Sequence, residues 1–285
     1  MPNFGKASYA RILAELAAEA EKAGWDGFFL WDHIIEYDWR VPLVDSFTAL
    51  AAIATRTKRI RIGTTVTPIP RLHPWVVARQ TASLDHLSNG RMTLGVGLGN
   101  EESCGYEKFG GDPDNRMLAE KVAEALDIIT GLWSGKPVSY RGKHYRIENV
   151  SFLPTPIQKP RIPIWVGGLW PAKGPFRRAA KWDGMIPLKH PEGLLKPNDL
   201  RVILDYTRSQ RTSREPFDVA VIGWTVSKYR EKNAEKVKPY YELGMTWWLE
   251  SLYTKRDAPE EMRARIRKGP PRISQTRKAN PEVHK

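Results

Sequence analysis

The chain has 285 residues, and 41% of them are hydrophobic, so it is long enough for one large domain with a sizeable core. Its single cysteine, Cys104, excludes a disulfide framework and fits a reducing compartment. The sequence shows neither an apolar run long enough to cross a bilayer nor a signal peptide, so we expect a cytoplasmic protein without a membrane partner.

The net charge of +13 raises the question of nucleic-acid binding. Between Lys255 and Lys285, ten Lys or Arg residues stand against four Asp or Glu residues, so much of the excess lies in one terminal segment. We expect residues 273–285 to form a basic, disordered tail. A solvated basic surface therefore explains the charge better than a nucleic-acid partner does.

In chain order, the sequence alternates helical and strand-like segments. Residues 9–23 carry apolar side chains at helical spacing, and Gly24 follows as a stop signal. Further helices are expected at 46–56, 74–88, 114–133, 173–181, 197–210 and 231–243. Short apolar strands are expected at 28–32, 60–66, 92–97, 162–166, 183–187, 217–223 and 245–249. Strands this apolar, each followed by a helix, are typical of a parallel sheet with helices on its outer face.

Seven strand–helix units are one fewer than a (β/α)8 barrel contains. The segment before the first helix, Met1-Pro2-Asn3-Phe4-Gly5, is typical of a loop that follows a strand. The sequence therefore predicts an α/β TIM barrel, residues 1–272, that lacks most of strand one and carries an inserted hairpin at 134–160. Because two uncovered sheet edges favour aggregation, we expect the natural start to lie upstream, and the added residues to raise soluble yield and flavin affinity.

In parallel barrels, ligands bind where the strands end. Asp32 and His33 follow the first apolar strand, where a histidine suits proton transfer. Such a pair can also have a purely structural role, in which the two side chains bond to each other. The segment Gly95-Val96-Gly97-Leu98-Gly99 is not a dinucleotide fingerprint, because Asn100 stands where the third glycine is required. We interpret its glycines as room for a flat ring or a phosphate at the strand end.

Gly167 and Gly168 precede a basic helix, which fits either an anion site or an ordinary turn. Most of the 11 tryptophans fit core packing, but Trp39, Trp170 and Trp224 are candidates for the walls of a pocket. The six histidines show no metal-ligand spacing, and no nucleophile-elbow pattern is present.

Six segments, taken in order, form a specific combination: Gly24–His33, Ile62–Pro68, His73–Arg91, Leu94–Gly99, Pro163–Gly168 and Ala179–Gly184. In this combination the chain resembles the luciferase-like monooxygenase family, from residue 2 to about Arg272. The resemblance implies a barrel that binds FMN, or the deazaflavin coenzyme F-420, at the mouth formed by the strand ends. It also implies a non-proline cis peptide beneath the ring system, which by position is the Thr65–Val66 bond.

The resemblance further implies roles for individual residues. In the deazaflavin branch a histidine and an acidic residue act in catalysis. His33 matches the histidine, whereas Asn100 occupies the acidic position with Glu101 beside it, and Tyr37 replaces a tryptophan. The expected catalytic residues are therefore His33 and Glu101. The expected cofactor contacts are Asp32, Thr65, Val66, Thr67, Gly97, Gly99, Asn100, Gly167 and Gly168, the last two at the phosphate.

The leading functional hypothesis is a two-component monooxygenase. A separate flavin reductase would supply reduced FMN, and molecular oxygen would then be used on a small organic substrate, with His33 as a proton donor. One alternative is F-420-dependent hydride transfer without oxygen chemistry. Another is a non-catalytic flavin-binding protein. The resemblance also implies a homodimer.

Overall fold

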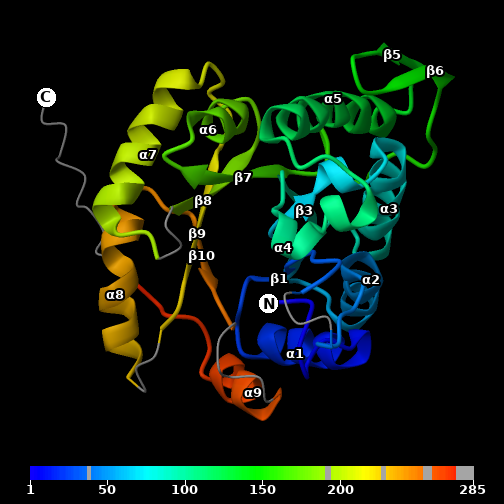
Figure 1. The fold of residues 1–285 in the computed structure, drawn as a ribbon. Coiled ribbons are helices and arrows are strands. Elements are labelled where there is room, and N and C mark those ends of the chain that lie inside the picture. Colours follow the sequence, from blue (N-terminus) through cyan, green and yellow to red (C-terminus); the bar gives the residue numbers. More distant parts are fainter. Residues whose placement is uncertain (37–39, 190–193, 226–228, 253–258, 274–285) are drawn as a thin grey trace, which may run out of the picture.

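The computed structural model describes residues 1–36, 40–189, 194–225, 229–252 and 259–273. Its centre is a curled parallel sheet in the spatial order β1-β2-β4-β7-β8-β9-β10, and the short strand β3 (Thr67–Pro68) pairs with β4 (Figure 1). The main strands are β1 (Gly27–Leu30), β2 (Arg61–Thr64), β4 (Met92–Gly97), β7 (Ile164–Trp170), β8 (Gly184–Lys189), β9 (Asp218–Gly223) and β10 (Trp247–Glu250).

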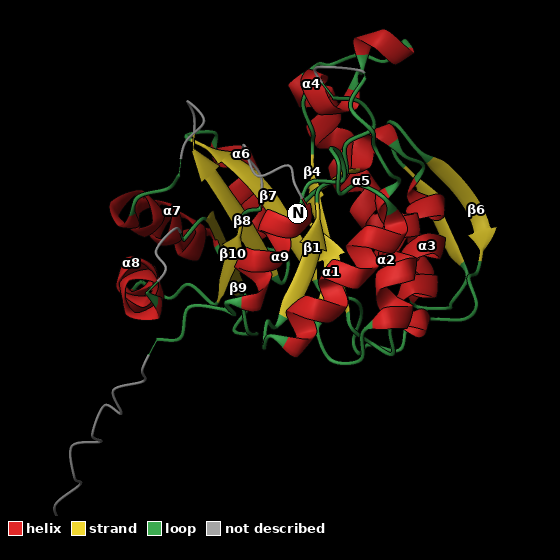
Figure 2. Ribbon diagram, turned by 90° about the horizontal axis from the view of Figure 1, so that it is seen from below, coloured by secondary structure: helices red, strands yellow, loops and turns green. Residues whose placement is uncertain are grey.

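Helices cover the outer face of this sheet, as Figure 2 shows. They are α1 (Ala10–Lys22), α2 (Ser46–Arg56), α3 (Pro74–Leu87), α5 (Asn115–Trp133), α6 (Lys173–Ala179), α7 (Pro197–Gln210) and α8 (Arg230–Glu242). The seven predicted strands and seven predicted helices are confirmed, with ends that shift by a few residues. Of the helices that the structure describes, none combines the length and the hydropathy that a membrane span requires.

The sheet does not close, because β1 and β10 are its two ends. Met1 lies beside the free edge of β1: its amino group donates to the Phe29 carbonyl at 2.8 Å, and the Trp31 amide donates to the Met1 carbonyl at 2.8 Å. This is the bonding pattern of a parallel bridge. A cavity of about 260 Å³ lies between the two edges, with Phe29, Trp247 and Ile266 among its walls. The fold is therefore a barrel with the place of one strand open, as the sequence predicted.

Helix α9 (Pro259–Arg267), which the sequence analysis did not predict, lies against this cavity. The Trp25 indole donates to the Ile266 carbonyl at 2.9 Å. The buried Arg265 guanidinium forms an ion pair with Glu250, with 3.1 Å between Nε and Oε1, and donates to the Thr225 hydroxyl at 2.6 Å. These contacts connect α9 to both ends of the open sheet. Residues 274–285 of the predicted tail lie outside the described residues.

The interior of the barrel is filled by aromatic side chains. Phe29, Trp165 and Trp247 pack together, with ring centroids 5.2 Å apart for the first pair and 5.4 Å apart for the two tryptophans. Ile186 and Ala220 complete this buried cluster. The lower barrel is thus a packed core, and the mouth above it is where ligands bind in parallel barrels.

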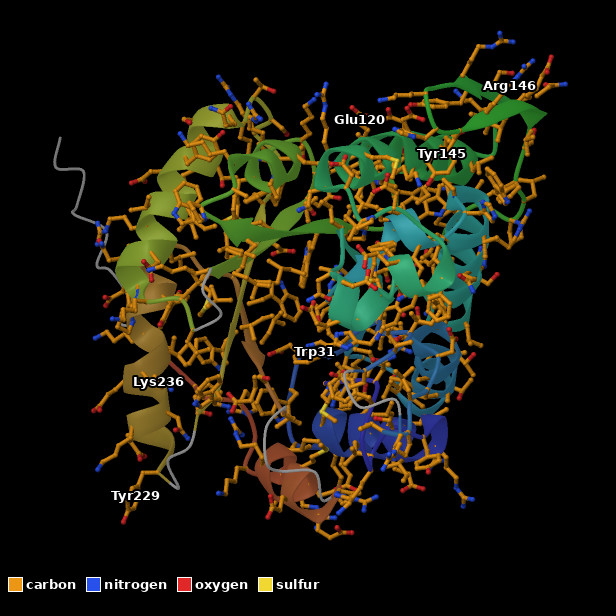
Figure 3. All side chains as sticks on the ribbon, viewed as in Figure 1. Trp31, Glu120, Tyr145, Arg146, Tyr229 and Lys236 are labelled. Atoms are coloured by element: carbon orange, nitrogen blue, oxygen red, sulfur yellow. The ribbon has the colours of Figure 1, made fainter. Side chains whose placement is uncertain are left out.

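The predicted hairpin is confirmed as β5 (Val138–Arg141) and β6 (Arg146–Val150), an antiparallel pair outside the main sheet. Figure 3 shows Tyr145 and Arg146 on this hairpin and Glu120 on α5. The Glu124 carboxylate of α5 accepts the backbone amide of Tyr145 at 3.1 Å, together with the two amides before it. The hairpin is therefore bonded to α5, away from the open edges.

Candidate active site

A buried ion pair lies just beyond the end of β1. Asp32 Oδ1 is 3.1 Å from Arg71 Nη2, and Arg71 Nη1 donates to the Asp32 carbonyl at 3.1 Å. Burial raises the pKa of Asp32, and the charge of Arg71 opposes this shift. Asp32 Oδ2 and Arg71 Nε are both buried without a hydrogen bond to any described residue. Because buried polar atoms in proteins are normally bonded, this pair has one acceptor and one donor to offer to a ligand.

His33 is held on both sides of its backbone by the buried Asn3. The Asn3 side chain accepts from the His33 amide at 3.1 Å and donates to the His33 carbonyl at 2.8 Å. The ring is fixed as well, since Nδ1 lies 3.0 Å from Glu36 Oε2 and the Phe4 ring stacks on it at 5.1 Å. The position of this histidine therefore depends on three residues from two loops.

Burial lowers the pKa of His33, and the neighbouring Glu36 carboxylate opposes this shift. A carboxylate only accepts hydrogen bonds, so the neutral ring carries its hydrogen on Nδ1. Nε2, which no described residue contacts by a hydrogen bond, is then left as a proton acceptor. The arrangement suits a general base at neutral pH.

The Thr65–Val66 peptide bond is cis, as expected from the resemblance. It connects β2 with the short strand β3, so that Val66 packs on top of the buried aromatic cluster. Thr67 is buried, and its hydroxyl donates to the Thr64 hydroxyl at 3.0 Å. The Thr65–Val66 segment thus forms a floor at the base of the mouth.

Two of the predicted ligand-binding glycines make room for this floor. A Cβ atom added to Gly97 would lie 2.6 Å from Val66 Cγ2, and one added to Gly167 would lie 2.8 Å from Val66 Cγ1. Both distances are far below van der Waals contact. Gly97 and Gly167 are therefore required first by the packing of Val66, and their contacts with a cofactor stay predictions.

Gly99 and Gly168 also have reasons within the protein. Gly99 has φ of +78°, and a Cβ atom there would lie 2.3 Å from Cys104 Sγ. Gly168 faces α6, where a Cβ atom would lie 2.8 Å from Pro175 Cβ. The basic helix α6 points its Arg178 to the Ala119 carbonyl, at 3.0 Å, so this cation is engaged with α5. A phosphate site at this turn remains a prediction.

Asn100 and Glu101 begin α4 (Glu101–Cys104), beyond the end of β4. The Asn100 side chain accepts from the Ser103 amide at 3.1 Å and so caps the helix. Glu101 Oε2 accepts from the Glu107 amide at 3.2 Å, whereas its Oε1 is buried without a partner among the described residues. The carboxylate that contacts His33 is therefore Glu36 and not Glu101, whose catalytic role stays a prediction.

Three residues of this site were missed by the sequence analysis: Asn3, Glu36 and Arg71. Glu36 had a signal, because it follows His33 by three residues. Arg71 is the first cation after Thr65–Val66, but Asn3 gives no signal of its own. The predicted Tyr37 and Trp39 lie outside the described residues. Within the described ranges, no three or more His, Cys, Asp or Glu side chains are grouped so that they could hold a metal ion.

Comparison with known proteins decides the family. Residues 4–279 match the sequence profile of the family described as luciferase-like monooxygenase. The chain belongs to this family. Among curated relatives, the F420-dependent glucose-6-phosphate dehydrogenase of Nakamurella multipartita is 28% identical over 81% of this chain and 84% of its own length. The protein of the same name from Microbacterium testaceum is 35% identical over 56% of this chain, and the match spans about half of that relative, 47%.

Two solved structures share the fold at low sequence identity. The monooxygenase RslO1 from Streptomyces bottropensis superimposes with a TM-score of 0.72 at 17% identity, covering 94% of this chain and 95% of that one. The coenzyme F420 dependent tetrahydromethanopterin reductase from Methanopyrus kandleri gives 0.71 at 16% identity, covering 94% and 96%. Both kinds of chemistry thus occur on this barrel, so the fold alone does not choose between them.

Proposed function

We propose that this chain is an F-420-dependent oxidoreductase that transfers a hydride between an alcohol and the cofactor. Curated relatives named as F420-dependent dehydrogenases support this alternative over the FMN monooxygenase that the sequence analysis favoured. The observation that carries the proposal is the pairing of His33 with Glu36 at the end of β1, 3.0 Å apart. It gives the mouth a proton acceptor suited to an alcohol.

The residues at the mouth fit such a cofactor. The floor formed by Thr65 and Val66 offers a support for a flat ring, and Asp32 Oδ2 offers an unused acceptor to a ring N–H or a hydroxyl group. When bound, F-420 supplies a deazaflavin ring that accepts or returns a hydride.

The protein's own residues would then position the alcohol and take its proton. Glu36 holds His33 with Nδ1 protonated, so that Nε2 accepts the hydroxyl proton as the alcohol is oxidised. Asn3 keeps the His33 backbone in place through its two hydrogen bonds. Arg71 balances the buried charge of Asp32, which would otherwise be costly to keep ionised.

Anaerobic reduction of F-420 by added alcohols tests this proposal. We expect loss of the visible band of oxidised F-420 with the wild-type chain and a strongly reduced rate with His33→Gln. Oxygen uptake that depends on reduced FMN and an organic substrate would instead support the monooxygenase, which also needs a separate reductase. Binding of flavin with neither activity would support the non-catalytic alternative.

A further inference from the structure

Four neighbouring strands present a row of apolar side chains at the mouth. Side chains alternate between the two faces of a strand, and Trp165 and Ile186 point into the barrel, where both belong to the interior cluster. Leu169 on β7 and Leu188 on β8 lie an even number of residues further on, so they point to the same side near the strand ends. They are register partners, and each is 41% exposed.

The row continues on the next two strands. Ile222 on β9 and Leu249 on β10 are also register partners, and both pack against the interior cluster. We call Leu169, Leu188, Ile222 and Leu249 the apolar row. Large exposed hydrophobic side chains that gather at one place mark a binding surface.

Lys189 and Glu250, which lie at the ends of the same strands, point away from this row. Lys189 follows Leu188 and therefore faces outward, where its Nζ is 2.7 Å from Asp199 Oδ1 on α7. Glu250 follows Leu249 and faces α9, where it pairs with Arg265. Lys236 of α8, labelled in Figure 3, donates from Nζ to the Trp224 carbonyl at 2.7 Å and lies 5.8 Å from the centroid of the Trp224 ring. These three charged groups are thus already bonded within the protein.

Among the described residues, the mouth therefore has two unlike halves. The β1 side supplies His33 and the Asp32–Arg71 pair, whereas the apolar row on β7–β10 supplies hydrocarbon. A phosphorylated sugar needs cations and hydrogen bonds along its whole length, which the apolar row does not provide. An alcohol with a hydrocarbon body matches both halves, because its hydroxyl group can meet His33 while its chain removes the row from water.

Resting on the proposed function, we infer that the substrate is an apolar alcohol whose hydrocarbon chain covers the apolar row. The alcohol C–H bond breaks with its electron pair, and this hydride goes to the deazaflavin ring of F-420. The O–H proton goes to His33 Nε2, and the alcohol becomes a ketone or an aldehyde. Oxidation of the alcohol by two electrons balances the reduction of the cofactor.

A series of 2-alkanols from 2-propanol to 2-heptanol tests this inference, with glucose 6-phosphate as the polar comparison. Each methylene group that leaves water should raise kcat/KM by about three- to fourfold until the row is covered. Glucose 6-phosphate should be the poorest substrate. A flat chain-length series, or glucose 6-phosphate as the best substrate, would overturn the inference while leaving F-420-dependent oxidation in place.

Leu188→Ser provides the test at the residue level. We expect it to flatten the chain-length series, with a loss of kcat/KM that grows from 2-propanol to 2-heptanol. Leu87→Ser is the matched control, since Leu87 is 48% exposed at the end of α3, outside the mouth, and the change should leave the series intact. If Leu188→Ser weakens F-420 binding and all alcohols equally, the row supports the cofactor instead, and the inference is wrong.

Calorimetry with the F-420-loaded protein keeps the test independent of turnover. 2-Heptanone should bind more tightly than glucose 6-phosphate, and Leu188→Ser should weaken the ketone selectively. Tighter binding of glucose 6-phosphate would overturn the inference. If F-420 itself does not bind, the proposed function fails, which is a separate result.

Discussion

Replacing Gly97 with alanine should damage cofactor binding through Val66. The added Cβ would lie 2.6 Å from Val66 Cγ2, whereas carbon atoms in contact are about 3.5–4.0 Å apart. Val66 must therefore move by roughly 1 Å, and its neighbour Gly167 leaves it little space, because the Cβ position there is only 2.8 Å from Cγ1. The floor of the mouth would rise into the space proposed for the ring.

Overpacking of this kind costs about 1–3 kcal/mol. If the whole cost appears in binding, the Kd for F-420 rises by roughly 5- to 150-fold. Fluorescence titration of the folded Gly97→Ala protein measures this change. Gly174→Ala is the matched control, because nothing lies within 4 Å of its Cβ position, and its affinity should be unchanged.

The double variant Gly97→Ala with Val66→Ala distinguishes this mechanism from general damage. Val66→Ala removes the Cγ2 methyl group that the new Cβ would meet, so the double variant should bind F-420 better than Gly97→Ala alone. Wild-type affinity in Gly97→Ala, or no recovery in the double variant, would refute the assignment of Val66 as the floor.

The remaining predictions concern the polar half of the mouth. His33→Gln should lower kcat by about 10²- to 10⁴-fold while the F-420 affinity stays nearly constant. Steady-state kinetics and a titration with F-420 measure the two quantities, and an equal loss of affinity would assign His33 to binding. Because burial lowers the pKa of His33, its basic form persists below the usual value, so kcat/KM should fall only at pH below about 6.5. Glu36→Gln removes the group that raises this pKa and should move the midpoint to lower pH; a shift to higher pH would contradict the pairing. Arg71→Leu leaves the Asp32 charge unpaired, and chemical denaturation should show a loss of about 3–5 kcal/mol, whereas an unchanged midpoint would mean that Asp32 is protonated.

Local patterns were sufficient to predict the barrel and one catalytic candidate. The spacing of apolar side chains along the sequence predicts strands such as Met92–Gly97 and amphipathic helices such as Ala10–Lys22. His33 was found because polar residues after buried strands gather at one edge of a parallel sheet. The cis bond at Thr65–Val66 was found by position in the family and by nothing in the local sequence.

The residues that the sequence did not predict are placed by contacts between distant segments. Asn3 reaches His33 only because the first loop lies across the end of β1, and no local pattern records this. The glycines were predicted as cofactor contacts, which stays a prediction, and their sequence could not show that Val66 occupies the space beside Gly97. Helix α9 was not predicted because its sequence is rich in charged residues. One of them, Arg265, is nevertheless buried, because it pairs with Glu250 of β10.

Competitive titration of the chain with F-420 and FMN tests the central claim most directly. Both cofactors are fluorescent, so binding can be followed with each one alone and with one displacing the other. We expect tight binding of F-420, weak binding of FMN, and a loss of F-420 affinity in Gly97→Ala but not in Gly174→Ala. Tighter binding of FMN than of F-420 would contradict it.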